Sequence, residues 1–289
     1  MDRWAKLIGL LLGAIIGGYW LYEANLDGSE ALNAGKTAMT QGRHSDAIVQ
    51  FTQVLEEIQR SGQSPFTSSG INVKHLANRQ AALRGLAEAH LKSGAPQAAS
   101  TYLEHARQAN AFDPMLPLLG AEIAEAQGDL QKAEVELSKV IESTPHFYRG
   151  YQLRARIRKL RNDCQGQAAD YHSALQNLDA AHLLYERIDA TLDLAWLLAT
   201  SSDSECRNGA QAVKLLSGLD QMIEERYTPV AYARFLSIKA AALAAVGEYT
   251  AAKASAEQAA LLVPVGSKQF SAIQLQQNAY NIGQPWREP

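Results

Sequence analysis

The chain has 289 residues and a formal net charge of −3, which excludes a global electrostatic attraction to nucleic acid. Hydrophobic residues make up 47% of the chain and aromatic residues only 7%. Because alanine and leucine abound while aromatics are few, the composition favours close-packed helices over a sheet, and we expect an all-α protein.

The first segment, LIGLLLGAIIGGYWLY, carries no charge from Leu7 to Tyr22. Counted from Trp4 it has 19 residues, and a helix of that length is about 28 Å long, which just spans a hydrocarbon core of about 30 Å. Basic residues precede it and acidic residues follow it, so the positive-inside rule predicts a cytoplasmic N-terminus. We expect residues 1–30 to form an uncleaved membrane anchor and a short lead-in.

A cleaved secretory signal is the competing interpretation of this segment. Cleavage after Ala24 would place the bulky Tyr22 in the third-last position, where a small residue is needed. Three glycines of the segment share one helix face at intervals of four residues: Gly9, Gly13 and Gly17. Such small-residue stripes let membrane helices approach closely, so this face could seat a transmembrane helix of a partner.

Small residues recur downstream with a step of 34 residues, as Ala87–Gly94–Ala99 and again as Ala121–Gly128–Ala133. The same skeleton fits Gly35–Gly42–Ala47 upstream and Ala240–Gly247–Ala252 near the end. One more step leads from Gly128 to Asn162, which can replace glycine because asparagine also adopts the left-handed conformation. In this pattern the glycine ends the first helix of a pair, and the alanines let the two helices cross closely.

This period and skeleton resemble the tetratricopeptide repeat, a helix–turn–helix unit. Because such units bury their apolar faces only by stacking, the resemblance implies a right-handed α-solenoid. It would cover residues 31–264 with about six units and an insertion near 61–77. Residues 265–289 would form a capping helix and a tail. A generic helical bundle is the competing interpretation, and the repeated 34-residue step disfavours it.

The fifth unit is longer and resembles a repeat variant of bacterial proteins. In that variant an Ala-Thr pair ends the first helix, a polar loop with an arginine follows, and an Ala-Val pair opens the second helix. Here these are Ala199–Thr200, Arg207 and Ala212–Val213. Together with the N-terminal segment, this resemblance implies a single-pass protein of the bacterial inner membrane with its repeats in the periplasm.

Cys164 and Cys206 both fall in loops that join the two helices of a unit, in the fourth and fifth units. Because stacked repeats place equivalent loops along one edge, the two cysteines could form a disulfide in an oxidising compartment. Two unrelated free thiols are the alternative, since the extra loop residues before Arg207 could carry Cys206 away.

Basic residues crowd the first helix of the fourth unit with no acidic residue between them: Arg149, Arg154, Arg156, Arg158, Lys159 and Arg161. Helical spacing places Arg149, Arg156 and Lys159 on one face, which corresponds to the concave face of the family. The predicted partner-binding residues are Arg149, Gln152, Arg156, Lys159 and Trp196, and the predicted partner is a protein with an acidic segment. Charge matching with the acidic third unit is the alternative.

The sequence contains no recognisable catalytic or metal-binding constellation. The seven histidines are scattered, and a phosphate-binding loop would need glycine where Glu30 stands. We therefore predict a protein that is not an enzyme and needs no cofactor, no metal ion and no small-molecule substrate. Its predicted role is scaffolding or assembly of a membrane complex through protein–protein interaction. A periplasmic chaperone-like module and an accessory subunit of an enzyme complex are the alternatives.

Overall fold

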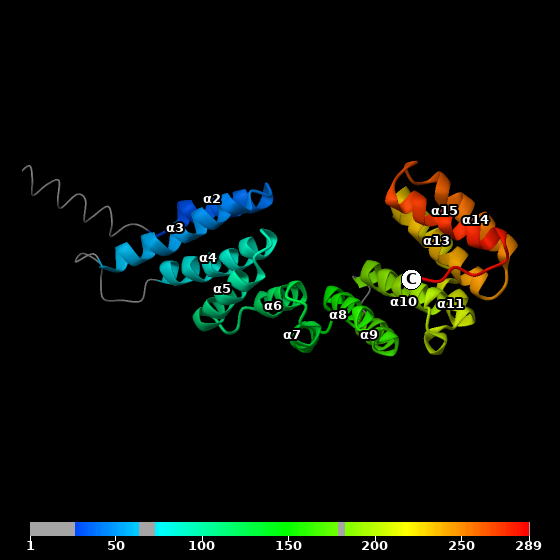
Figure 1. The fold of residues 1–289 in the computed structure, drawn as a ribbon, viewed down its shortest axis with the longest axis horizontal. Helices are drawn as coiled ribbons and strands as arrows, with labels where there is room; N and C mark the ends of the chain where they lie inside the picture. The colour runs from blue at the N-terminus through cyan, green and yellow to red at the C-terminus, as the bar shows by residue number, and fades with distance from the viewer. Residues whose placement is uncertain (1–26, 64–72, 179–182, 289) are drawn as a thin grey trace, which may run out of the picture. The chain divides into compact units, whose positions relative to one another are not determined.

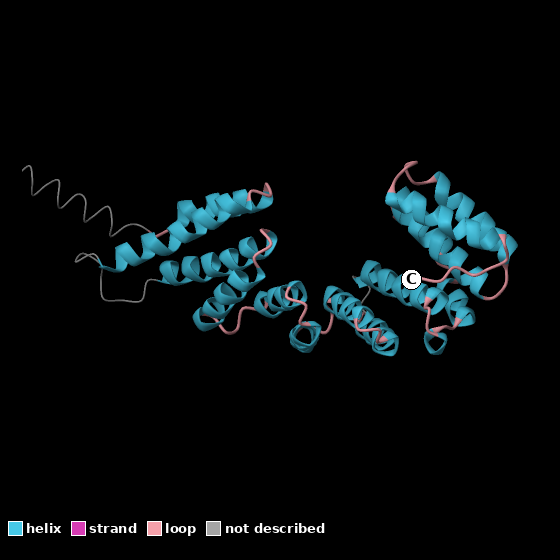
Figure 2. Ribbon diagram, viewed as in Figure 1, coloured by secondary structure: helices cyan, strands magenta, loops and turns pink. Residues whose placement is uncertain are grey.

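The structure is a computed structural model that describes residues 27–63, 73–178 and 183–288. The predicted anchor, with Gly9, Gly13 and Gly17, lies outside these residues. The described ranges contain helices joined by loops, and no strand occurs in them (Figure 2). Among the helices within these ranges, none is long and apolar enough to span a bilayer.

The helices follow one another in pairs along the chain (Figure 1). In chain order they are α2 (Ser29–Thr40), α3 (His44–Gln63), α4 (Val73–Lys92), α5 (Pro96–Ala109), α6 (Met115–Ala126), α7 (Leu130–Ser143), α8 (Tyr148–Leu160), α9 (Cys164–Asn177), α10 (Leu184–Thr200), α11 (Gly209–Leu216), α12 (Asp220–Arg226), α13 (Pro229–Ala245), α14 (Tyr249–Leu261) and α15 (Lys268–Asn281). A short 3-10 helix, η2 (Ser204–Cys206), lies between α10 and α11.

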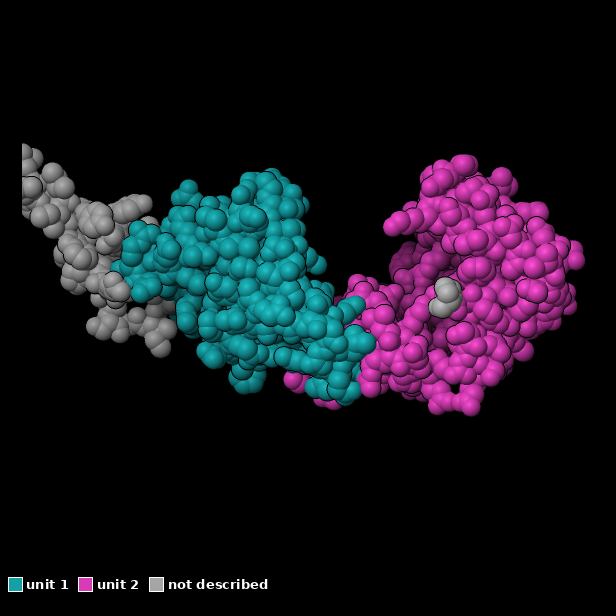
Figure 3. Space-filling model, viewed as in Figure 1, with its two compact units in different colours: residues 1–136 teal, residues 137–289 magenta. Residues whose placement is uncertain are grey.

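The chain forms two compact units, residues 1–136 and residues 137–289, shown in different colours in Figure 3. Each unit has its own pairs of packed helices, α2 with α3 and α4 with α5 in the first, α8 with α9 and α13 with α14 in the second. The fold is therefore all-α and built of helix–turn–helix pairs, as the sequence predicts. The right-handed stacking of the units stays a prediction.

The predicted turn residues all adopt the left-handed backbone conformation: Gly42, Gly94, Gly128, Asn162 and Gly247, with φ between 58° and 88°. Asn162 is the one residue other than glycine with positive φ in the described ranges. In the pair α6 and α7, the amide of Gly128 donates to the carbonyl of Glu125, and that of Asp129 donates to Ala124. These bonds close the helix end in the manner expected of a left-handed C-terminal cap, so the predicted helix pairing is confirmed at these turns.

The ring of Phe51 explains why the first repeat has a glycine, Gly35, as the first small residue of its skeleton. A Cβ atom on Gly35 of α2 would lie 2.5 Å from the Phe51 ring, and one on Gly85 of α4 would lie 2.6 Å from the same ring. Both distances are shorter than any carbon–carbon contact allows. The two glycines therefore let α2 and α4 close on the buried ring of α3, which anchors the core of the first unit.

Helices extend into both ends of the predicted insertion, since α3 reaches Gln63 and α4 begins at Val73. The early turns of α4 have contacts that keep them helical. Lys74 forms an ion pair with Asp27, and Asn78 Nδ2 donates to the carbonyl of Asp27 at 2.7 Å. Hydrogen bonds from Lys74 and Ser29 lower the pKa of Asp27 to about 2. The helix α12 was likewise not predicted, whereas α15 matches the predicted capping helix.

Replacing Ala133 by leucine will destabilise the first unit by about 1–3 kcal/mol, because an enlarged side chain forces its neighbours out of their packing. Ala133 has no exposed surface, and Ala121 of the same repeat is 3% exposed. Urea unfolding followed by far-ultraviolet circular dichroism measures the change. Val135→Leu on the same helix is the matched control, since Val135 is 47% exposed. Equal midpoints for the two variants would show that the repeat register is wrong.

Candidate partner-binding groove

One cavity of the second unit, about 310 Å³ in volume, is lined by every predicted partner-binding residue: Arg149, Gln152, Arg156, Lys159 and Trp196. Four of these residues come from α8 at steps of three and four, which places them along one helix face. Trp196 comes from α10. We call this surface the basic groove. Its lining also includes Leu153, Gln167, Tyr171, Asp193, Leu197 and Glu288.

Side-chain hydrogen bonds order the wall of the groove that α8 supplies. Arg149 Nη1 donates to Gln152 Oε1 at 2.6 Å, and Gln152 Nε2 donates in turn to Asp193 Oδ2 at 3.1 Å. Lys159 Nζ lies 2.6 Å from Glu288 Oε1. The groove thus presents positive charge while its amide and carboxylate groups hold the cationic side chains in place.

Asp193 is the polar centre of the groove, and sequence reasoning missed it. Its carboxylate accepts a 2.6 Å hydrogen bond from the Tyr148 hydroxyl and forms an ion pair with Arg234 of α13. Burial and the nearby Asp193 charge raise the pKa of Tyr148, so the hydroxyl keeps its proton and remains a donor. The sequence does contain a signal for Asp193. The spacing of Asp189, Asp193 and Trp196 places both acids on the same helix face as the tryptophan.

On the opposite side of α8, two arginines share one carboxylate of the helix with which α8 is paired. Asp170 of α9 is 1% exposed, and its Oδ1 atom lies 2.6 Å from Arg154 Nη2 and 2.9 Å from Arg158 Nη1. Arg154 also donates to the Ser138 hydroxyl at 2.9 Å. Charge matching therefore accounts for two of the basic residues, and the carboxylate that pairs with both belongs to Asp170 of α9.

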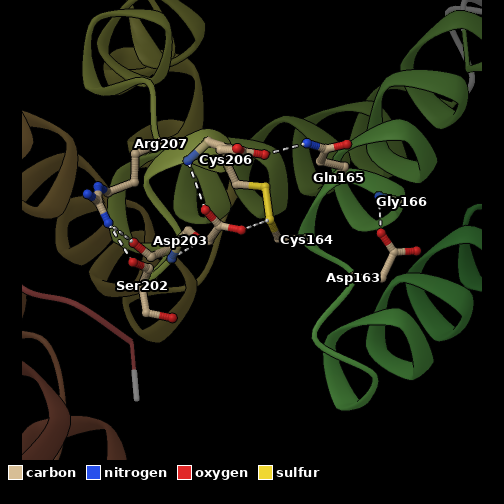
Figure 4. Close-up of a disulfide and its surroundings, with 10 residues drawn as sticks. Asp163, Cys164, Gln165, Gly166, Ser202, Asp203, Cys206 and Arg207 are labelled. Carbon is tan, nitrogen blue, oxygen red and sulfur yellow. Dashed lines mark hydrogen bonds between the residues drawn. A yellow bond between two sulfur atoms is a disulfide. The ribbon is translucent and has the colours of Figure 1, made fainter.

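Cys164 and Cys206 are joined by a disulfide, and their Cα atoms lie 6.1 Å apart (Figure 4). The bond ties the first residue of α9 to the last residue of η2. Beside it, Gln165 Nε2 donates to Glu205 Oε2 at 3.0 Å. The η2 loop is thus held to α9 by a covalent bond and a hydrogen bond.

Arg207, the arginine of the polar loop between α10 and α11, bonds to the backbone of that loop. Its Nη1 atom donates to the carbonyls of Ser201 at 3.1 Å and Ser202 at 2.7 Å, which fixes the loop after α10 (Figure 4). In the described part of the chain, one group has ligand atoms close enough to hold a metal ion: Cys164, Asp203 and Cys206. Because metals bind thiolates, the two sulfurs joined to each other do not form such a site.

The C-terminal segment contributes one residue, Glu288, to the lining of the groove. Trp286 packs against the hydrophobic core of the second unit, and the next two residues reach α10. Arg287 Nη1 donates to the Ala199 carbonyl at 2.8 Å, and the Glu288 amide donates to the Thr200 carbonyl at 2.8 Å. The sequence predicts only a tail here, because nothing local indicates where such a segment returns.

No protein-family model matches the chain, and no curated protein matches it. Among solved structures, the chain is similar to the TPR domain of P58(IPK), with 13% identity and a TM-score of 0.35. That match covers 88% of this chain, which spans 66% of the length of the other. A TPR repeats protein from Bacteroides fragilis NCTC 9343 is 15% identical with a TM-score of 0.34, covering 89% of this chain and 99% of that one.

The repeats are tetratricopeptide-like. The observations that carry this assignment are the chain's own helix pairs, with their left-handed turn residues at 34-residue steps from Gly94 to Asn162. A fold of this kind is consistent with a protein–protein interaction module.

Proposed function

We propose that this protein is a non-catalytic scaffold whose basic groove binds an extended acidic segment of a partner protein. The observation that carries the proposal is the convergence of Arg149, Arg156 and Lys159 on one cavity beside the half-buried Trp196. Guanidinium and ammonium groups bind carboxylates, and an aromatic side chain at the centre of a groove is the usual anchor of a peptide.

A photo-reactive phenylalanine analogue in place of Trp196 tests this proposal in the native cells. We expect one dominant cross-linked partner, and we expect Lys159→Glu to remove it because the reversed charge repels an acidic segment. The matched control is the same analogue at Leu261, which is 85% exposed and lines none of the groove. Many weak products from position 196 would favour the chaperone-like alternative, and identical products from both positions would contradict the groove.

We further propose that the protein is anchored in the bacterial inner membrane by its N-terminal segment, with the repeats in the periplasm. Two observations support the proposal. Positive charges precede the apolar segment and acidic residues follow it, and a disulfide such as Cys164–Cys206 is rare in the cytosol but common in the periplasm.

A reporter enzyme that is active only outside the cytoplasm, fused after Pro289, will be active in intact cells. The reason is that the basic residues Arg3 and Lys6 retain the N-terminus in the cytoplasm. Moving the two positive charges to the other side of the segment is the control, and it should reduce the activity. Activity from a cytoplasmic reporter alone would contradict the proposed topology.

A further inference from the structure

The end of α10 depends on distant residues for its hydrogen bonds. The last four carbonyls of a helix are left without partners further along it, and in α10 they belong to residues 197–200. Two are satisfied nearby, because Ser201 N donates to the Leu197 carbonyl and Asn208 N donates to the Leu198 carbonyl. The C-terminal segment satisfies the other two, those of Ala199 and Thr200.

The same segment places a carboxylate in the basic groove. Glu288 lines the cavity together with the predicted partner-binding residues, and its Oε1 atom lies 2.6 Å from Lys159 Nζ. The Glu288 carboxylate also lines an adjoining cavity of about 400 Å³, which reaches Cys164 and Asp203. An acidic residue of this chain thus already makes the contact that the proposed function assigns to a partner.

We propose that Arg287 and Glu288 are an internal ligand of the basic groove and of the adjoining end of α10, and that a partner segment binds after displacing them. This inference rests on the proposed function of the same groove. The competing segment is an extended peptide that carries a carboxylate for Lys159 and donors for the two carbonyls at the end of α10. A peptide with an arginine followed by a glutamate meets both requirements.

The Lys159–Glu288 contact is suited to displacement, because its two side chains are 44% and 31% exposed. Trp286, by contrast, packs its partly buried ring against the hydrophobic core of the unit. Solvent weakens an ion pair of that exposure. The apparent affinity for a competitor is the intrinsic affinity multiplied by the fraction of molecules in which the internal ligand is released. Release of Arg287 and Glu288 should therefore raise the affinity while Trp286 keeps its place.

Fluorescence anisotropy of a labelled peptide tests the proposal with the full chain in detergent micelles. The probe is fluorescein-labelled Gly-Ser-Arg-Glu-Ser-Glu-Gly, and its counterpart with glutamine in place of glutamate controls for charge. We expect the double variant Arg287→Ala/Glu288→Gln to bind the probe about tenfold more tightly than the unmodified chain, since the competing segment is then released. Glu257→Gln, the same change at an exposed carboxylate of α14, should bind like the unmodified chain.

Adding Lys159→Met to the double variant should abolish the tighter binding, which would locate the probe in the groove. If the unmodified chain and the double variant bind the probe equally through Lys159, the internal ligand is overturned while the proposed function stands. If the double variant does not bind the probe, or binds it with Lys159 replaced, both the internal ligand and the acidic-segment function are overturned.

Discussion

Replacing Cys164 and Cys206 by serine will lower the free energy of unfolding of the second unit by about 4 kcal/mol. The bond joins residues 42 positions apart, and closing a loop of that length restricts the unfolded chain by about that amount. Urea unfolding followed by tryptophan fluorescence measures the loss, because Trp196 and Trp286, the tryptophans within the described residues, both belong to this unit.

The reductant dithiothreitol supplies the control for this experiment. It should shift the unfolding midpoint of the unmodified protein to that of the serine variant, and it should leave the serine variant unchanged. Two alkylatable thiols in unreduced protein from native membranes would show that the bond does not form there.

Replacing Asp170 by asparagine will destabilise the second unit by about 3 kcal/mol, since it removes the buried carboxylate that pairs with the guanidiniums of Arg154 and Arg158. The carboxylate is 1% exposed, while the two arginine side chains are 15% and 18% exposed. That remaining contact of the arginines with water keeps the expected loss at the lower end of the range for broken buried ion pairs. The same fluorescence-detected unfolding measures it.

Asp46→Asn is the matched control, because it removes the same charge from an ion pair at the surface. Asp46 pairs with Arg43 at 2.5 Å, and both side chains are more than half exposed. Such pairs contribute about 0–1 kcal/mol. Since Asp46 belongs to the first unit, its loss is measured by circular dichroism rather than by tryptophan fluorescence. A loss for Asp170→Asn no larger than that for Asp46→Asn would mean that α8 and α9 are not held together by this cluster.

The features that the sequence predicts correctly are those set by a local rule. Asn162 could be assigned a left-handed conformation because the 34-residue step placed it in a turn, and turn geometry depends on adjacent residues alone. The groove wall from Arg149 to Lys159 could be placed on one face because the helical period fixes which side chains lie together.

The features that escaped prediction join residues far apart in the sequence. The ion pair of Asp193 spans 41 positions to Arg234, and its bond to Tyr148 spans 45. A repeat pattern indicates which residues face a neighbouring helix, but not which polar side chains meet there. The Cys164–Cys206 disulfide was predictable only in part. The repeat brought their loops together, but the loop conformation that Arg207 stabilises could not be derived from the spacing.

The dependence of α10 on Arg287 also has a consequence for how the protein is made. The donor and the Ala199 carbonyl are 88 positions apart, and ribosomes add about 5–20 residues per second. For several seconds of each synthesis, the chain therefore lacks the donors that satisfy the Ala199 and Thr200 carbonyls and the carboxylate that pairs with Lys159. A nascent chain stalled in that interval would offer its cationic surface to any acidic polypeptide nearby. Synthesis of Arg287 and Glu288 supplies the missing donors and the carboxylate.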